Sequence, residues 1–308
     1  MDTPVIRVEN LVKRFKGHLS IRTHTAVDGL SFQVDRGGVC GFLGPNGAGK
    51  TTTLKILMDL IRADAGSAEI FGRAPGDAAV KARLGYLPET PYFYDHLTGR
   101  ELLRYYGQLR GLGDALIAAR SADLLKEVGM THAADRRLRT YSKGMLQRIG
   151  MAQALIGDPE LVVLDEPMTG LDPIGRAEFR GIIMNLRARG KTVIFSSHIL
   201  ADAEALCDRV VIINKSKMVS AGSLQELLSG HADRVRVSLA GLSAGGWSAG
   251  FTPVSSPEGV FNFLVPDPET GNQLVARALA AGGRLVAFES LHPDLETIFV
   301  KRVQEDAQ

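Results

Sequence analysis

The chain has 308 residues, and its 36 Lys and Arg nearly balance its 34 Asp and Glu, giving a formal net charge of +2. This length has room for about two domains. Because the positive and negative charges nearly cancel, the net charge gives no case for nucleic acid as the main partner. The two cysteines, Cys40 and Cys207, lie in apolar surroundings, which excludes a disulfide framework or a cysteine metal cluster and fits a reducing cytoplasm.

The amino-terminal part is predicted to be rich in strands, because short runs of β-branched and alternating apolar residues recur there. No signal peptide is expected at its start. From Thr98 to Gly129 the apolar residues change to a spacing of three and four, which predicts a helical insert over about residues 90–157. The strand-like runs are Val5–Val8, Leu30–Val34, Val39–Leu43 and Ala68–Phe71.

Beyond the insert, predicted strands alternate with predicted helices, a pattern typical of a mainly parallel α/β sheet. The strands are Leu161–Leu164, Thr192–Phe195 and Val210–Ile213, and the helices lie near Met145–Ile156, Gly175–Arg189 and Leu200–Cys207. A hairpin at Asn214–Ser220 leads to a short helix at Leu224–Leu228.

A domain boundary is predicted near residue 230, which divides the chain into residues 1–230 and 231–308. The second part reads as a small α+β module, and its Gly- and Ser-rich stretch Ala240–Glu258 is expected to be an exposed loop. Its predicted elements are the strands Val235–Leu239, Val260–Val265 and Arg284–Glu289 and the helices Asn272–Ala281 and Leu295–Arg302. No apolar run approaches the roughly 18 to 20 residues that cross a bilayer.

A phosphate-binding loop lies between the strand Val39–Leu43 and a helix predicted over Thr51–Leu60. The residues spell G-x-x-x-x-G-K-T, so consecutive backbone N–H groups and a helix N-terminus converge on one anion. Lys50 is expected to bridge the β- and γ-phosphates, the Thr51 hydroxyl to complete a Mg²⁺ shell, and Thr52 to touch the α-phosphate. A loop that only turns a strand into a helix would not need the ordered Gly-Lys-Thr. The loop comprises Gly44, Pro45, Asn46, Gly47, Ala48, Gly49, Lys50 and Thr51.

Two carboxylates follow the apolar strand Leu161–Leu164. A buried strand can hold Asp165 rigidly near Mg²⁺, while Glu166 polarises the attacking water as a general base. The alternative interpretation is that the two acids only end a strand at the surface. The presence of a phosphate-binding loop in the same chain disfavours it. The pair therefore predicts hydrolysis of the bound nucleotide.

A short polar segment just before that strand opens a helix, with Ser142 able to cap it. With this segment, the order of motifs resembles the nucleotide-binding subunit of an ABC transporter, of the type-two exporter branch. Tyr141-Ser142-Lys143-Gly144-Met145 occupies the place of the LSGGQ signature of that family. The resemblance covers residues 5 to about 228, and it implies an ABC-type P-loop fold with a mainly parallel core sheet, an amino-terminal antiparallel β region, a helical insert and a small accessory α+β domain.

The resemblance also assigns three further segments. Gly85–Glu89 takes the place of the Q-loop, which makes Glu89 a metal ligand beside Thr51 and Asp165. Gly170–Pro173 takes the place of the D-loop, with Asp172 at the dimer interface. His198 takes the place of the switch histidine. By residue type alone, His198 would read as a core or helix-start histidine and Asp172 as a turn residue.

Two departures from the family pattern bear on catalysis. In the signature, Lys143 replaces the first glycine, and Met145 replaces a glutamine whose side chain donates hydrogen bonds. In the Q-loop, Glu89 replaces glutamine and exchanges a neutral ligand for an acidic one. We interpret both as variants of the exporter branch and expect an active ATPase.

The aromatic residue expected to stack on adenine is Phe15, in the amino-terminal β region. Core packing is the alternative interpretation of this side chain. The stretch Lys16–Thr25, which follows it, is longer than usual for the family.

The resemblance implies that two copies pair head to tail around ATP, with the phosphate-binding loop of one copy facing Ser142–Met145 of the other. A chain without spans then needs a separate polytopic permease, which would place it on the cytoplasmic face of the membrane as a peripheral subunit. The aromatic stretch Thr90–Asp95 is proposed as part of a groove for a permease helix, and a hydrophobic staple within the insert is the alternative.

Two rival functions stay open from the sequence. One is a non-transport mechanochemical ATPase of the same fold, although such proteins carry two ATP domains or a long coiled coil in one chain. The other is a regulatory module that holds ATP without turnover, which Glu89 and Met145 motivate. The cargo of a transporter lies beyond what these residues indicate.

Overall fold

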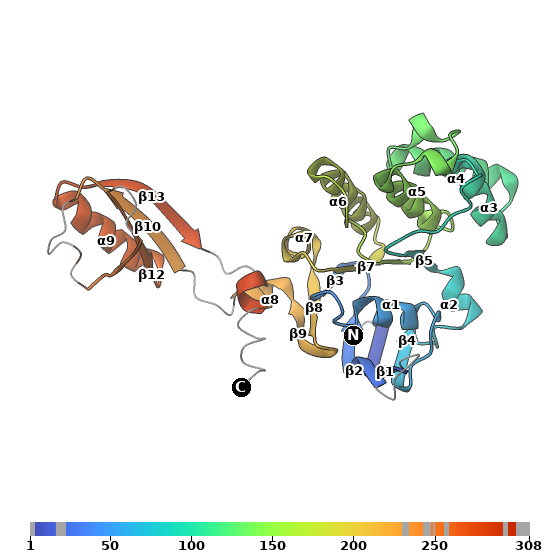
Figure 1. Ribbon diagram of the computed structural model, residues 1–308, viewed down its shortest axis with the longest axis horizontal. Helices are drawn as coiled ribbons and strands as arrows, with labels where there is room; N and C mark the ends of the chain where they lie inside the picture. Colours follow the sequence, from blue (N-terminus) through green and yellow to red (C-terminus); the bar gives the residue numbers. More distant parts are fainter. Residues whose placement is uncertain are drawn as a thin grey trace. The chain divides into compact units, whose positions relative to one another are not determined.

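The computed structural model describes residues 4–16, 23–229, 234–242, 248, 250–255, 259–291 and 295–299. By its internal contacts the chain forms two compact units, one running to Leu224 and one beginning at Gln225 (Figure 1). The domain assignment of residues 1–230 and 231–308 stays a prediction.

A six-stranded sheet forms the centre of the first unit. The strands at its centre are mostly apolar and buried along their whole length, which is typical of strands that are covered on both faces. The first five strands in its order pair in parallel and the last returns antiparallel, so the predicted, mainly parallel sheet is confirmed. The order is β5 (Leu84–Leu87), β6 (Leu161–Leu164), β7 (Thr192–Ser197), β3 (Val39–Leu43), β8 (Arg209–Asn214) and β9 (Lys217–Ser223).

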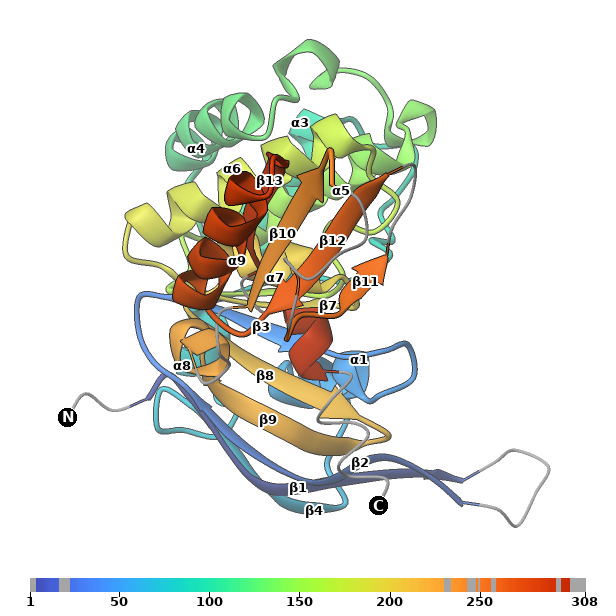
Figure 2. The ribbon, with the colours of Figure 1, turned by 90° about the vertical axis from the view of Figure 1, so that its left-hand side faces the viewer.

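An antiparallel sheet of three strands makes a second layer, as the family resemblance implied. Its order is β2 (Thr23–Val34), β1 (Ile6–Lys16) and β4 (Ala65–Ile70), and Figure 2 shows the long β1–β2 ribbon along one side. Helix α1 (Lys50–Leu57) contributes Leu54 and Leu57 to one buried cluster that also holds Leu11 of β1 and Val163 of β6. The helix that follows the phosphate-binding loop is therefore packed between the two sheets.

The predicted helical insert consists of three helices: α3 (Gly99–Leu109), α4 (Asp114–Glu127) and α5 (Lys143–Leu155) (Figure 1). The start of α3 is fixed by a capping box, in which the Thr98 hydroxyl accepts from the Glu101 N–H and the Glu101 carboxylate accepts from the Thr98 N–H. Helices α6 (Pro173–Ala188) and α7 (Leu200–Leu206) pack against β7. The short helices α2 (Ala78–Ala82) and α8 (Leu224–Ser229) complete the α-helices of the described residues 4–229.

Three details of the prediction from the sequence differ from the structure. The stretch Ala240–Glu258, expected to be an exposed loop, contains the strand Pro253–Ser255. The helix predicted to end at Leu60 ends at Leu57, because Asp59 takes a left-handed backbone with φ of 54° that no helix can continue. The segment Gly85–Glu89, assigned by resemblance to the Q-loop, begins within strand β5, which the sequence did not predict because four residues are too few to stand out by periodicity.

The second unit has a four-stranded antiparallel sheet in the order β11 (Pro253–Ser255), β12 (Val260–Val265), β10 (Arg234–Ala240) and β13 (Arg284–Leu291). Helix α9 (Pro268–Ala280) buries Leu274 and Ala278 against Val235, Val237 and Phe263 of the sheet. Residues 295–299 are helical, and the rest of the helix predicted to run to Arg302 lies outside the described residues. The predicted α+β composition is confirmed for the described part.

None of the helices in the described ranges combines the length and the apolar character that a membrane span requires.

Candidate nucleotide site

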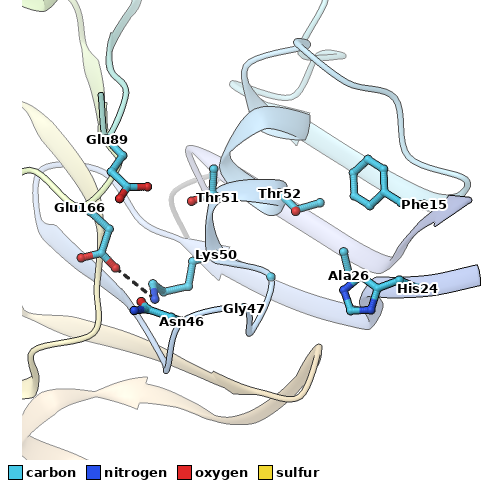
Figure 3. Close-up of a pocket in the computed structure, with 11 residues that line it drawn as sticks. Phe15, His24, Ala26, Asn46, Gly47, Lys50, Thr51, Thr52, Glu89 and Glu166 are labelled. Atoms are coloured by element: carbon cyan, nitrogen blue, oxygen red, sulfur yellow. Dashed lines mark ion pairs between the residues drawn. The ribbon is translucent and has the colours of Figure 1, made fainter. Parts of the chain in front are cut away.

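Many of the predicted site residues gather where β3, β6 and β7 end at their carboxyl termini, the edge at which open α/β sheets bind ligands. A pocket of about 360 Å³ opens there, over the N-terminus of α1 (Figure 3). Nine of the predicted residues line it together with two that the sequence did not indicate, His24 and Ala26. The predicted ones are Phe15, Asn46, Gly47, Gly49, Lys50, Thr51, Thr52, Glu89 and Glu166.

The glycines of the phosphate-binding loop are required by its backbone. Gly49 has φ of 106°, and a Cβ there would lie 2.2 Å from the carbonyl oxygen of Ala26. A Cβ on Gly44, at φ of 157°, would lie 2.3 Å from the carbonyl oxygen of Ile213. The loop thus lies directly against β2 and β8, and no side chain fits at either position.

Lys50 is the cation of this pocket, and its side chain is only 5% exposed. Its Nζ donates to the carbonyl oxygens of Gly44 at 2.7 Å and Pro45 at 3.2 Å, and lies 3.1 Å from Oε1 of Glu166. All three partners of the ammonium are oxygen atoms of residues that form the site. Phosphate oxygens of a bound nucleotide could replace these contacts without a large movement of the ammonium.

Asp165 is held by two hydroxyls. Its Oδ1 accepts from Ser196 Oγ at 2.7 Å and from Thr51 Oγ1 at 3.1 Å. Burial raises the pKa of this carboxyl, while the two hydrogen bonds lower it in part. Ser196 also accepts from the backbone N–H of Glu166 at 2.8 Å, so one hydroxyl fixes both acids of the pair.

Removing that hydroxyl by Ser196→Ala should misplace both acids. We expect ATP turnover to fall by about 10- to 100-fold, as for a small displacement of catalytic groups, and the free energy of unfolding by about 1–3 kcal/mol because two buried polar groups lose their partner. Phosphate release and chemical denaturation measure the two effects. Ser67→Ala, at an exposed serine of β4, is the control that should change neither; turnover equal to wild type in Ser196→Ala would show that this hydroxyl has no such role.

Glu166 is buried and contacts Lys50, His198 and Thr169. Its Oε2 lies 2.8 Å from Nδ1 of His198 and accepts from Thr169 Oγ1 at 3.0 Å. Burial alone would raise the pKa of Glu166, but Lys50 and His198 outweigh it and hold the pKa below its ordinary value. The residue is thus ionised at neutral pH, and it takes a left-handed φ of 47°, the kind of backbone strain that is found at functional sites.

Comparisons with known proteins agree with this geometry. The family model described as "ABC transporter" matches residues 27–169. An uncharacterized ABC transporter ATP-binding protein of Synechocystis is 43% identical over 278 residues, which cover 90% of this chain and 78% of that protein. The chain belongs to the ABC transporter ATP-binding proteins.

Two further comparisons extend this result. The Nod factor export ATP-binding protein I of Ralstonia nicotianae is 39% identical over 230 residues, covering 74% of this chain and 70% of that protein. A solved ATP-binding subunit of an ABC transporter matches with a TM-score of 0.65 and 31% identity, covering 73% of this chain and 92% of that one. This ABC protein therefore binds and hydrolyses ATP as the subunit that powers a separate permease, and the two rival functions are not favoured.

The oxygen atoms of the site can bind Mg²⁺ only if a triphosphate supplies further oxygen ligands. In the described residues, no group of three or more His, Cys, Asp and Glu is placed to hold a metal ion. Thr51 and Glu89 instead offer a hydroxyl and a carboxylate to the pocket, and the Asp165 carboxylate accepts from the Thr51 hydroxyl. Mg²⁺ is usually bound in this way, by one or two carboxylates plus phosphates and water, so the donor set fits.

The residues in the place of the signature do not line the pocket of their own ABC subunit. The Ser142 hydroxyl caps α5 by accepting from the Met145 N–H at 3.3 Å, and the Asp172 carboxylate caps α6 by accepting from the Gly175 N–H at 2.6 Å. Leu171 lies 3.4 Å from a Cβ built on Gly144. The Lys143 ammonium lies next to Gly170, so the signature and D-loop segments pack together within one chain.

Phe15 lines the pocket at the end away from Glu166, with 42% of its surface exposed (Figure 3). Its ring lies 5.4 Å from the Lys13 ammonium. It is not a core residue, which removes the alternative interpretation. Ser196, His24 and Ala26 were missed, because their place depends on strand pairings that the sequence does not show. Thr169 was missed as well, although it lies only three residues after the Glu166 that it contacts.

Proposed function

We propose that two copies of this chain pair head to tail around two ATP and drive a permease that exports its cargo. The observation that carries the pairing is the split of the site. Lys50 and Glu166 line one pocket and His198 contacts Glu166, whereas Ser142 and Gly144 lie at a helix N-terminus that does not line it. A helix N-terminus that presents free N–H groups is an anion site, and a second copy supplies it to the open side of the pocket.

Within each site the residues have separate roles. Lys50 and backbone N–H groups within residues 44–52 hold the triphosphate. Thr51, Asp165 and Glu89 would hold Mg²⁺, which would supply neutralisation of the phosphate charge. Glu166 accepts a proton from the attacking water, and His198 fixes the orientation of that carboxylate. Ser142 and Gly144 of the second copy donate to the γ-phosphate, Lys143 and Met145 flank them, and Asp172 lies at the interface.

The pairing is tested by placing a bulky charge in the signature. Gly144→Arg should leave ATP binding to the single chain unchanged, because Gly144 does not line the pocket, but should prevent ATP-driven pairing in analytical ultracentrifugation. Gly181→Arg on α6 is the matched control, since a Cβ there meets nothing within 4 Å. Pairing of the Gly144→Arg protein with ATP would refute the head-to-tail arrangement.

The direction of transport rests on relatives, because ATP-binding proteins with export in their names match most of this chain. The membrane position follows from the permease: we propose a peripheral subunit on the cytoplasmic face. Direction is checked in vesicles that contain the permease with which this subunit assembles, where ATP on the side of this subunit should deplete cargo from that side.

The groove proposed for a permease helix is supported by the exposed aromatic side chains after Glu89. Tyr92 is 88% exposed, and Phe93 stacks edge-on to Tyr106 with ring centroids 6.4 Å apart. Both line a pocket of about 330 Å³ with Leu60 and Met58. An aromatic side chain that is almost fully exposed beside an apolar pocket is typical of a contact surface.

Truncating this surface should separate transport from hydrolysis. Tyr92→Ala together with Phe93→Ala should reduce transport by at least about 10-fold, as for loss of an interface anchor, while basal ATPase stays within about twofold because neither side chain touches the nucleotide pocket. Tyr92→Ala alone removes no core contact, so it tests the surface without risk to the fold. Leu116→Ala on α4, also an exposed apolar residue, is the control; undiminished transport in the double variant would remove this groove from the coupling.

A further inference from the structure

Two aromatic rings border the pocket at the end away from the catalytic carboxylate. Phe15 in β1 is paired directly with His24 in β2, and facing residues of antiparallel strands point to the same side with their Cβ atoms about 4.5–5.5 Å apart. Figure 3 shows both side chains at this end, with Ala26 near them and Thr52 between them and Lys50.

Both side chains are accessible to solvent. Phe15 is 42% exposed and His24 is exposed as well. Among the ring contacts of the described residues, none joins this pair. Ala26, which is 5% exposed, contributes only a methyl group to the lining beside them. Two exposed rings on facing residues that do not pack on each other can accept a flat base between them, with a π-face on each side.

We propose that His24 is a specificity-determining residue for the nucleotide, forming with Phe15 a two-sided slot for a purine base. The inference rests on the proposed function, because a triphosphate held by Lys50 and Thr51 directs its nucleoside past Thr52 toward this end. Stacking from two sides rewards a large π-face, and purines have a larger one than pyrimidines.

The slot selects the size of the base and not its identity. The lining at this end is Phe15, His24 and Ala26, with no amide or carboxylate to read the hydrogen-bonding edge of a base among the described residues. The amide of Asn46 lies beside Lys50, at the other end of the pocket (Figure 3). ATP and GTP therefore bind with affinities within a few-fold of each other, and CTP binds more weakly.

The test measures binding of four ligands to the full chain by titration calorimetry, without Mg²⁺ so that no hydrolysis occurs: ATP, GTP, CTP and inorganic triphosphate. His24→Ala should weaken ATP and GTP by about 5- to 100-fold, the range for loss of one stacking partner of a base. His24→Phe should restore both, and inorganic triphosphate should bind all variants equally. Thr23→Ala, an exposed neighbour on β2 that does not line the pocket, is the matched control.

Distinct results separate this inference from the proposed function. ATP affinity that is unchanged in His24→Ala, triphosphate affinity that falls as much as ATP affinity, or CTP that binds as tightly as ATP would each overturn the purine slot. Triphosphate that does not bind the wild-type chain would contradict the nucleotide site itself. His24→Phe keeps the aromatic ring on the strand, so failure of this variant to restore ATP binding also counts against the slot.

Discussion

Glu166→Gln should reduce ATP turnover by about 10²- to 10⁴-fold, the contribution of a positioned general base. The substitution keeps the size of the side chain and one of the two oxygens, of which Oε1 contacts Lys50 and Oε2 contacts Thr169 in the wild type. It removes the carboxylate that accepts the proton. ATP binding should therefore survive, and nucleotide-bound pairs should accumulate because hydrolysis no longer opens them.

Phosphate release under saturating ATP measures the first effect, and size-exclusion chromatography with ATP the second. Glu69→Gln, on the exposed side of β4, carries the same chemical change away from the pocket and should behave as wild type. If Glu166→Gln and wild type release phosphate at the same rate, Glu166 is not the base.

Lys50→Ala should abolish both ATP affinity and nucleotide-driven pairing. The ammonium is the cation that lines the pocket, and without it the phosphates would face the Glu166 carboxylate with no charge between them. A charge-assisted contact of this kind to a buried anion contributes about 1.5–3 kcal/mol each, and Lys50 is expected to make two. We expect ATP affinity to fall by at least about 100-fold.

The same change alters the protein without nucleotide. Loss of Lys50 leaves the carbonyl oxygens of Gly44 and Pro45 without this donor and Glu166 without its lysine partner. The pKa of Glu166 should therefore rise. Because a depressed carboxyl pKa stabilises the fold at pH values above the unfolded pKa, this contribution is lost in the variant at neutral pH and was already absent in strong acid. Unfolding curves at neutral and acidic pH measure it.

Lys55→Ala is the control for both effects, because this exposed lysine lies in the last turn of the same helix and outside the pocket. ATP-driven pairing of Lys50→Ala, observed by ultracentrifugation, would show that the nucleotide is not the link between the two copies.

The parts of the site that lie within one continuous segment could be predicted from the sequence. Strand β3, the phosphate-binding loop and α1 follow one another along the chain, so their motif implies their geometry. Strand β6 was predicted with its observed bounds, because an uninterrupted apolar run ends there at Asp165. The fold class followed from the alternation of strands and helices together with the family resemblance.

The parts that depend on which strands are neighbours could not be predicted. Leu164 pairs with Phe195, so the next residues along the two strands, Asp165 and Ser196, become neighbours and share a hydrogen bond. Nothing in the serine itself indicates this role. His24 was missed for the same reason, because its pairing with Phe15 joins two strands whose register the sequence does not show.

The cap of α5 has a consequence for which amino acids position 142 accepts. Capping uses only a lone pair of the Ser142 hydroxyl, which leaves its proton to be donated elsewhere. Serine, threonine and aspartate all cap a helix, but aspartate has no proton to give and would meet a polyanion with negative charge. Selection for folding alone would therefore accept Ser142→Asp, whereas selection for transport would reject it. Variants recovered under selection for folding and under selection for transport should therefore differ at this one position.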